Sequence, residues 1–141
     1  MHMDATITLS NPTRFTAGIL LLTIVTIEFG GTYLLRIVRG AAPATPFQVA
    51  FARAGHAHAG VLVLFALVCQ LYVDGVDLGG IREAIARDGV ALAAILMSAG
   101  FFLSSAGKGR SEPNSLIVLV YAGAASLAAG TLTLGYALVT S

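Results

Sequence analysis

Charged side chains are scarce in this chain of 141 residues, in which 8 Lys and Arg and 7 Asp and Glu make up 11% of the sequence. A soluble domain carries about 25% charged residues, so this chain has too little charge to cover a surface that faces water. The net charge is only +1, and the basic residues are spread singly, which excludes the clustered basic face of a nucleic-acid-binding protein. Because lipid covers the outside of a polytopic membrane protein, a content of 57% hydrophobic residues indicates that class.

Cysteine occurs once, at Cys69, so no disulfide within the chain is possible and the count says nothing about the redox compartment. We expect Cys69 to fill space in a helix as a small apolar residue. The sequence also has no C-x-x-C-H heme attachment, no Gly-rich phosphate loop and no G-x-S-x-G elbow. These absences exclude the usual signatures of covalent heme, nucleotide and serine-hydrolase chemistry, and they leave open whether the chain is an enzyme.

Long apolar stretches dominate the sequence, and each is close to the ~20 residues that a helix needs to cross ~30 Å of hydrocarbon. Prolines in segments 39–46 and 111–114, and charged residues gathered in 74–88, separate these stretches. The short connections predict an all-α integral membrane bundle of four transmembrane helices, antiparallel and up-down, in a single domain over residues 1–141. The predicted spans are residues 15–38, 47–73, 90–106 and 116–139.

Two segments allow a second interpretation. The segment "IREAIARD", which precedes the third span, is expected to form one interfacial turn of helix with Ile81 and Ile85 on the lipid side. The first apolar run is an alternative candidate for a cleaved signal peptide, with the small residues Ala42 to Ala44 as a cleavage site. Its 24 residues exceed the usual ~7–15-residue apolar core of such a peptide, so a transmembrane helix is the preferred interpretation.

The distribution of basic residues predicts the orientation in the membrane, because cytoplasmic loops carry an excess of Lys and Arg. The first and third connections hold more of them than the opposite side, so we expect these connections in the cytoplasm and both termini outside. The compact Ala- and Gly-rich sequence suggests a bacterial inner (plasma) membrane. The residues on the cytoplasmic side are Arg36, Arg39, Lys108 and Arg110, with Arg53 if it snorkels, and those on the other side are Arg14, Arg82 and Arg87.

Three ionisable residues are expected at one depth near the middle of the membrane. Glu28 lies ten residues before Val38, and His56 and His58 lie nine and eleven residues after Phe47. At ~1.5 Å per residue, all three are about 13–17 Å from the same membrane face. Ionisable groups at this depth almost always face the bundle interior and find a partner. Either Glu28 and one histidine hydrogen-bond each other and fix the register of two helices, or the three form a ligand or proton site.

The His-x-His spacing limits what the two imidazoles can do together. Residues two apart on a helix diverge by about 200°, so His56 and His58 cannot both bind one metal ion on an unbroken helix. One histidine then faces the bundle and the other a subunit interface, or each serves a different cofactor or partner. Arg53 shares the face of His56. The surrounding small residues, and those of "YAGAASLAAGTLTLG" in the fourth span, favour close helix packing, with room for a flat ligand as the alternative.

The helix "GHAHAGVLVLFALV" resembles the H-x-H helix of heme-copper oxidase subunit I, in which two histidines on opposite faces each ligate a different heme. It is also similar to the H-A-H helix of small bacterial membrane proteins. The resemblance implies that His56 and His58 are axial heme ligands, with Met97 or a residue of another copy as the second ligand. The chain has no H-x-x-x-Y pair and no adjacent histidines for a copper centre, so the resemblance does not extend to oxygen reduction.

Three functions therefore compete. The first is binding of heme or a transition metal such as Fe, Cu or Zn, with His56, His58 and Glu28 as metal ligands and Arg53 beside a heme propionate. The second is a proton-coupled transporter or channel that works as an oligomer, because Glu and His titrate in the required range. The third is an accessory subunit of a larger membrane complex. The sequence ranks them in this order.

Overall fold

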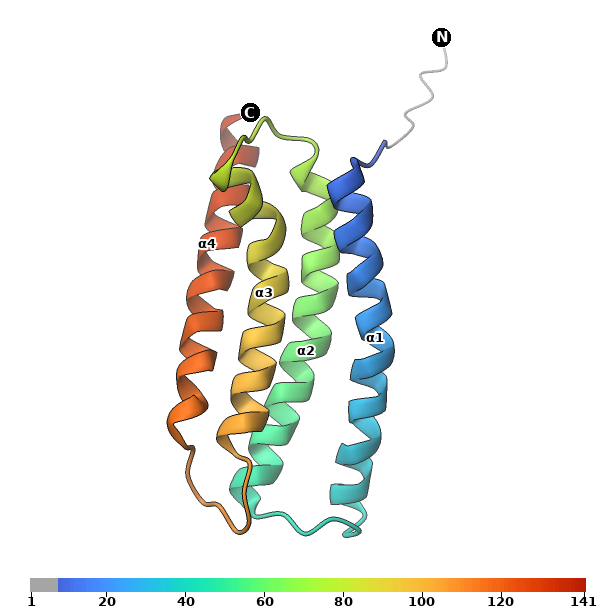
Figure 1. Cartoon of the computed structure of the whole chain (residues 1–141), viewed down its shortest axis with the longest axis vertical. Coiled ribbons are helices and arrows are strands. Elements are labelled where there is room, and N and C mark those ends of the chain that lie inside the picture. The colour runs from blue at the N-terminus through green and yellow to red at the C-terminus, as the bar shows by residue number, and fades with distance from the viewer. Residues whose placement is uncertain (1–7) are drawn as a thin grey trace.

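The computed structural model describes residues 8–141 and is all-helical over that range (Figure 1). A short 3₁₀ helix, η1, leads into the last α-helix. The prediction of an all-α chain with four helices long and apolar enough to cross a membrane is confirmed. The elements are α1 (Asn11–Val38), α2 (Pro46–Val73), α3 (Ile81–Ser104), η1 (Ser115–Ile117) and α4 (Val118–Thr140).

The first two helices begin at strong capping signals in the sequence. Ser10 accepts a hydrogen bond from the N–H of Thr13 at 3.3 Å, and Pro12 lies in the first turn of α1. Thr45 and Gln48 form a capping box at the start of α2, in which each side chain accepts a hydrogen bond from the backbone N–H of the other. These caps explain why α1 begins at Asn11 and α2 at Pro46.

The four helices form a row in which each packs on the next, α1 on α2, α2 on α3 and α3 on α4. Among the described residues α1 and α4 do not contact each other. Figure 1 shows the connections 39–45 and 105–114 at one end of the helices and the connection 74–80 at the other. The core lies mostly between α2 and α3, and its most deeply buried hydrophobic residues are Ala66, Val73, Ala86, Val90 and Ala93.

Glycines bring the backbones of α3 and α4 into direct contact. A Cβ atom on Gly89 would lie 2.9 Å from the Cα of Gly130, and one on Gly100 would lie 2.7 Å from the backbone nitrogen of Val120. The hydroxyl of Ser126 donates a hydrogen bond of 2.8 Å to the carbonyl oxygen of Gly89. The packing role predicted for the small residues of the fourth span is therefore confirmed at this interface.

The third helix begins at Ile81 and not at Val90, so "IREAIARD" is not a separate interfacial turn but the first two turns of α3. The expectation that Ile81 faces outward holds, since this side chain is 74% exposed, but Ile85 is half-buried and its carbonyl lies beside Gly130. The helix continues through this charged stretch because Arg87 is buried and paired within the protein. The sequence rule that charges mark a break was wrong here.

The first helix is the least enclosed of the four. Only 6% of its most apolar segment is buried, compared with 33% in α2 and 39% in α3. It packs almost entirely against α2, because α3 contributes only a few contacts and α4 none. Most of the α1 surface is therefore left to lipid or to a partner.

Candidate functional site

His58 is a half-buried residue of α2 whose ring lies beside α3. Its Nδ1 is 2.8 Å from the carbonyl oxygen of Ala54, one turn earlier in the same helix. The imidazole packs against the ring of Phe101 of α3, with 4.9 Å between the ring centroids. Phe51 makes an edge contact with the same phenyl ring at 5.5 Å. Because a carbonyl only accepts hydrogen bonds, Nδ1 is the donor in this bond, and Nε2 is the ring nitrogen that the bond does not use.

His56 lies on the opposite side of α2, in the interface with α1. A Cβ atom on Gly31 would lie 3.3 Å from its Cε1 and 3.5 Å from its Nε2, and one on Gly30 would lie 3.9 Å from its Nδ1. The two glycines of α1 therefore leave the space that the His56 ring occupies. The divergence expected from the His-x-His spacing is what the structure shows, with His56 against α1 and His58 against α3.

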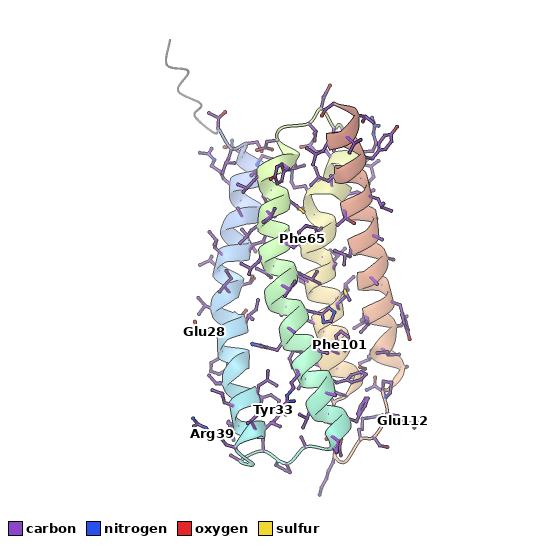
Figure 2. The ribbon with its side chains drawn as sticks, turned by 180° about the vertical axis from the view of Figure 1, so that it is seen from behind. Glu28, Tyr33, Arg39, Phe65, Phe101 and Glu112 are labelled. Carbon is purple, nitrogen blue, oxygen red and sulfur yellow. The ribbon has the colours of Figure 1, made fainter. Side chains whose placement is uncertain are left out.

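Glu28 is at the expected depth, three residues from Gly31, but its side chain is exposed on the outside of α1 (Figure 2). Ile27 packs toward the core and Gly31 contacts His56, so α2 faces these two residues and Glu28 is rotated about 100° from Ile27. Among the described residues no hydrogen bond or ion pair of Glu28 is found. Equal depth did not make Glu28 a partner of either histidine, because depth along a helix does not determine direction around it.

The other two residues expected at a cofactor also lie apart from His58. Met97 is 9% exposed and packs into the interface of α3 with α4, where its Cγ would be 2.5 Å from a Cβ atom on Gly123. Arg53 is exposed on α2, one turn before His56, and has no ion pair within the described chain. Arg53 is therefore directed away from the ring of His58, and the contact shown for Met97 is with Gly123 of α4.

Within residues 8–141 no group of three or more His, Cys, Asp or Glu side chains is placed to hold a metal ion. Glu28, His56 and His58 point in three different directions, so one chain does not gather them around one ion. Cys69 is 3% exposed and belongs to the hydrophobic core, as expected for an apolar filler. His2 lies outside the described residues.

A buried ionic cluster near the start of α3 was not expected from the sequence. The guanidinium of Arg87, which is 6% exposed, lies 3.1 Å from Asp74 and 2.8 Å from Glu83. It also donates a hydrogen bond to the hydroxyl of the fully buried Thr13, which itself donates to Asp74 at 2.8 Å. This arginine cluster joins α1, α3 and the connection between α2 and α3. The spacing of Glu83 and Arg87, four residues apart on a helix, was the available sequence signal.

The carboxylate of Asp74 receives several hydrogen bonds at this cluster. The Ser10 N–H donates at 2.8 Å and the Ser10 hydroxyl at 2.9 Å, in addition to the bonds from Thr13 and Arg87. Desolvation raises the pKa of Asp74, but these hydrogen bonds outweigh it and lower the pKa from 3.8 to about 2. The carboxylate therefore stays charged at neutral pH, which is typical of a structural ion pair.

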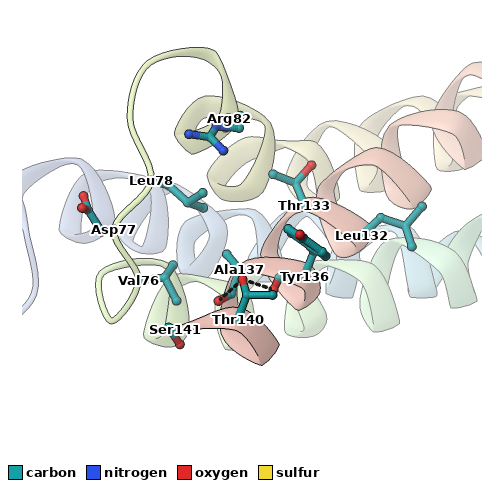
Figure 3. A pocket seen from close by; sticks show the side chains of 10 residues that line it. All are labelled: Val76, Asp77, Leu78, Arg82, Leu132, Thr133, Tyr136, Ala137, Thr140 and Ser141. Atoms are coloured by element: carbon teal, nitrogen blue, oxygen red, sulfur yellow. Dashed lines mark hydrogen bonds between the residues drawn. The ribbon is translucent and has the colours of Figure 1, made fainter.

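A cavity of about 560 Å³ lies between the connection 74–80 and the end of α4, far along the helices from both histidines (Figure 3). Figure 3 shows the side chains that surround it, including Asp77, Arg82 and Tyr136. It holds no histidine and no second acidic group, so it offers no set of ligands for a metal or heme. The strongest chemical candidate in the described chain remains the pair of histidines on α2.

No family model, curated protein or solved structure matches this chain. Its function is therefore inferred from its own residues.

Proposed function

We propose that the protein is an integral membrane protein of four antiparallel helices that binds heme through His58, in a redox or cofactor-handling role. The observation that carries the proposal is the hydrogen bond from His58 Nδ1 to the carbonyl oxygen of Ala54. In metal-ligating histidines the second ring nitrogen usually donates to a carbonyl or carboxylate, which orients the ring and leaves the other nitrogen free to ligate. His58 has this arrangement, and its Nε2 is the free nitrogen.

Heme is favoured over a bare metal ion because the two need different numbers of protein ligands. A protein-bound zinc ion usually takes three or four side-chain ligands, and the described chain does not assemble three. The iron of heme already has four ligands from the porphyrin, so one imidazole can hold it. Phe51 and Phe101 add an apolar aromatic surface beside His58. Bound heme would supply redox and ligand-binding chemistry at its iron.

His58 would be the one residue of the chain that holds the heme iron in this proposal. His56 faces α1, and Met97 is packed against α4, so neither is directed to the same iron. Arg53 lies on the face of His56, about 140° around α2 from His58, and would not serve a propionate of this heme. The expected spectrum is then that of a heme with one protein ligand.

Hemin titration of the protein in mild detergent, followed by visible spectroscopy and analysis for Fe, Cu and Zn, tests the proposal. We expect a Soret band at about one heme per chain in the wild type. His58→Ala should lose the band, and His56→Ala is the matched control that should keep it. Circular dichroism of each variant excludes loss by unfolding. A folded, colourless wild type that takes up no hemin contradicts heme binding, and a band lost only in His56→Ala contradicts the choice of ligand.

The proposed orientation puts the connections 39–45 and 105–114 in the cytoplasm. They lie at the same end of the molecule, where Thr45 donates a hydrogen bond to the carbonyl of Arg110, and they contain Arg39 and Lys108. Their shared excess of basic residues supports a cytoplasmic location. In a Cys69→Ala background, Lys108→Cys should not react with a membrane-impermeant maleimide in intact cells. Reaction at this position would show that the orientation is the opposite one.

Proton-coupled transport by an oligomer is the second candidate, and the exposed position of Glu28 favours it. Glu28 lies near the middle of α1 on its exposed side, and an ionisable residue within a transmembrane segment is a candidate for a proton or ion path. In liposomes with an internal pH-sensitive dye, the wild type should dissipate an imposed pH gradient and Glu28→Gln should not. Equal rates in the two proteins would remove this candidate.

A further inference from the structure

Glu28 occupies an unfavourable position in a single copy of the protein. It lies near the middle of α1, exposed, and the residues one helical heptad before and after it, Leu21 and Leu35, are 57% and 54% exposed. A charged side chain at the centre of a bilayer is costly, and it almost always finds a partner. A partner outside the chain would remove this cost.

Arg53 is a second exposed charge without a partner in the described chain. It lies three residues before His56, which contacts Gly31, and Glu28 lies three residues before Gly31. Because α1 and α2 run in opposite directions, these offsets add to about 9 Å along the helix axes. The side chain of an arginine is long enough to cover much of that distance.

Glu28 and Arg53 also lie on the same side of the pair formed by α1 and α2. On α1, Glu28 is rotated about 100° from Ile27, and on α2, Arg53 is rotated about 60° from His56. On α2, Gly55 contacts α3 and is rotated from His56 in the opposite sense to Arg53, so Arg53 lies on the side that faces away from α3. Because the two helices are antiparallel, the rotation of Glu28 on α1 leads to the same side. One open face thus carries one negative and one positive charge.

We infer that this α1–α2 face binds a second copy of the chain, with Glu28 of each copy paired to Arg53 of the other. A two-fold axis along the membrane normal keeps every residue at its own depth and makes each contact twice. The face is complementary to itself because it carries both charges within exposed apolar surface such as Leu64 of α2. Gly60, one heptad after Arg53, has open space around it and permits close approach of a helix from the second copy.

A foreign partner would need its own acid and base in matching positions, whereas a second copy supplies both. A pair within one chain is the remaining alternative, and charge reversal distinguishes the two. We expect the wild type in nanodiscs or mild detergent to have the mass of a dimer. Glu28→Arg and Arg53→Glu should each be monomeric, because each places like charges opposite each other in its own homodimer.

Mixing the two variants is the decisive measurement. Glu28→Arg leaves two arginines on the face, and Arg53→Glu leaves two glutamates, so the two variants complement each other. Differently tagged copies of the two variants should therefore co-purify as a heterodimer. Pairing within one chain predicts no such heterodimer and would overturn the inference. Glu112→Arg is the matched control, because it reverses a charge on an exposed connection. This variant should keep the mass of a dimer. A monomeric wild type would also overturn it.

Cross-linking tests the same face without changing its charges. In a Cys69→Ala background, Leu21→Cys or Leu35→Cys should form a disulfide between copies on mild oxidation, and Leu132→Cys on the exposed side of α4 should not. Cross-links at Leu132 alone would place the interface on α4 and contradict the proposal. The dimer requires no heme, so colourless protein is suitable and the result is independent of the proposed cofactor.

Discussion

The buried Arg87 forms an ion pair with Asp74, with 3.1 Å between Nη2 and Oδ1, that joins α3 to the connection following α2. Arg87 is also the residue through which Thr13 of α1 and Glu83 of α3 are held together. The carbonyl oxygen of Arg87 accepts a hydrogen bond of 2.7 Å from Gln70 of α2, so three helices meet at this one residue. Since α1 contacts little besides α2, this cluster is a principal anchor of its first turn.

Replacing Arg87 should therefore destabilise the protein strongly. Arg87→Leu leaves the carboxylates of Asp74 and Glu83 without their cationic partner, and the loss of a hydrogen bond to a charged group typically costs about 1.5–3 kcal/mol. Arg82→Leu, one turn earlier and exposed, is the control and should change stability little. Unfolding in mixed detergent micelles, followed by circular dichroism, measures both. Equal stabilities of the two variants would show that the cluster does not hold the helices together.

The pKa of Asp74 predicts a loss of stability in acid. The folded-state pKa of about 2 is below the ordinary 3.8, so the folded state binds fewer protons and is favoured above pH 3.8. This stabilisation is lost as the pH falls from 3.8 to 2. Asp74→Asn should be less stable at neutral pH and should lack this part of the acid transition, which a thermal melt at each pH detects. Asp77→Asn, in the same connection, should keep the wild-type pH profile.

The contact of Gly89 with Gly130 predicts that replacement by alanine has very different effects on stability at two glycines of α4. A Cβ atom on Gly130 would lie 3.2 Å from the Cα of Gly89 and 3.2 Å from the carbonyl oxygen of Ile85, both of which are backbone atoms. Gly130→Ala should thus separate α3 from α4 and cost about 1–3 kcal/mol. Gly135→Ala adds its methyl group to open space and should be neutral or slightly stabilising. Equal effects would contradict the close packing.

The side chain of Gln48 on α2 binds the connection between α3 and α4, so replacing it should destabilise that connection. Its amide nitrogen donates to the carbonyl oxygens of Ser105 at 3.0 Å and Gly107 at 2.7 Å, while its amide oxygen completes the cap with Thr45. Gln48→Ala should lose about 1–3 kcal/mol and expose residues 105–109 to faster hydrogen exchange. Gln48→Glu keeps the acceptor of the cap but loses the donors, so its exchange should rise in 105–109 while the start of α2 stays protected.

Hydropathy predicted the ends of the first two helices closely. The predicted spans 15–38 and 47–73 end where α1 and α2 end, because apolar length is a local property. The predicted start of the third helix was wrong by nine residues. The charges of residues 81–88 look unfavourable in isolation, and only the fold shows that Asp74 and Thr13 neutralise and enclose Arg87.

For the candidate site too, some features follow from the sequence and others only from the fold. The sequence by itself determined the number of helices, the positions of Glu28 and both histidines along them, and the opposite directions of His56 and His58. All of these follow from hydropathy, helix rise and helix periodicity. Only the tertiary structure decided what each of them faces. Which side of α1 meets α2 depends on packing summed over the whole interface, and that packing turned Gly31 toward His56 and left Glu28 on the outside.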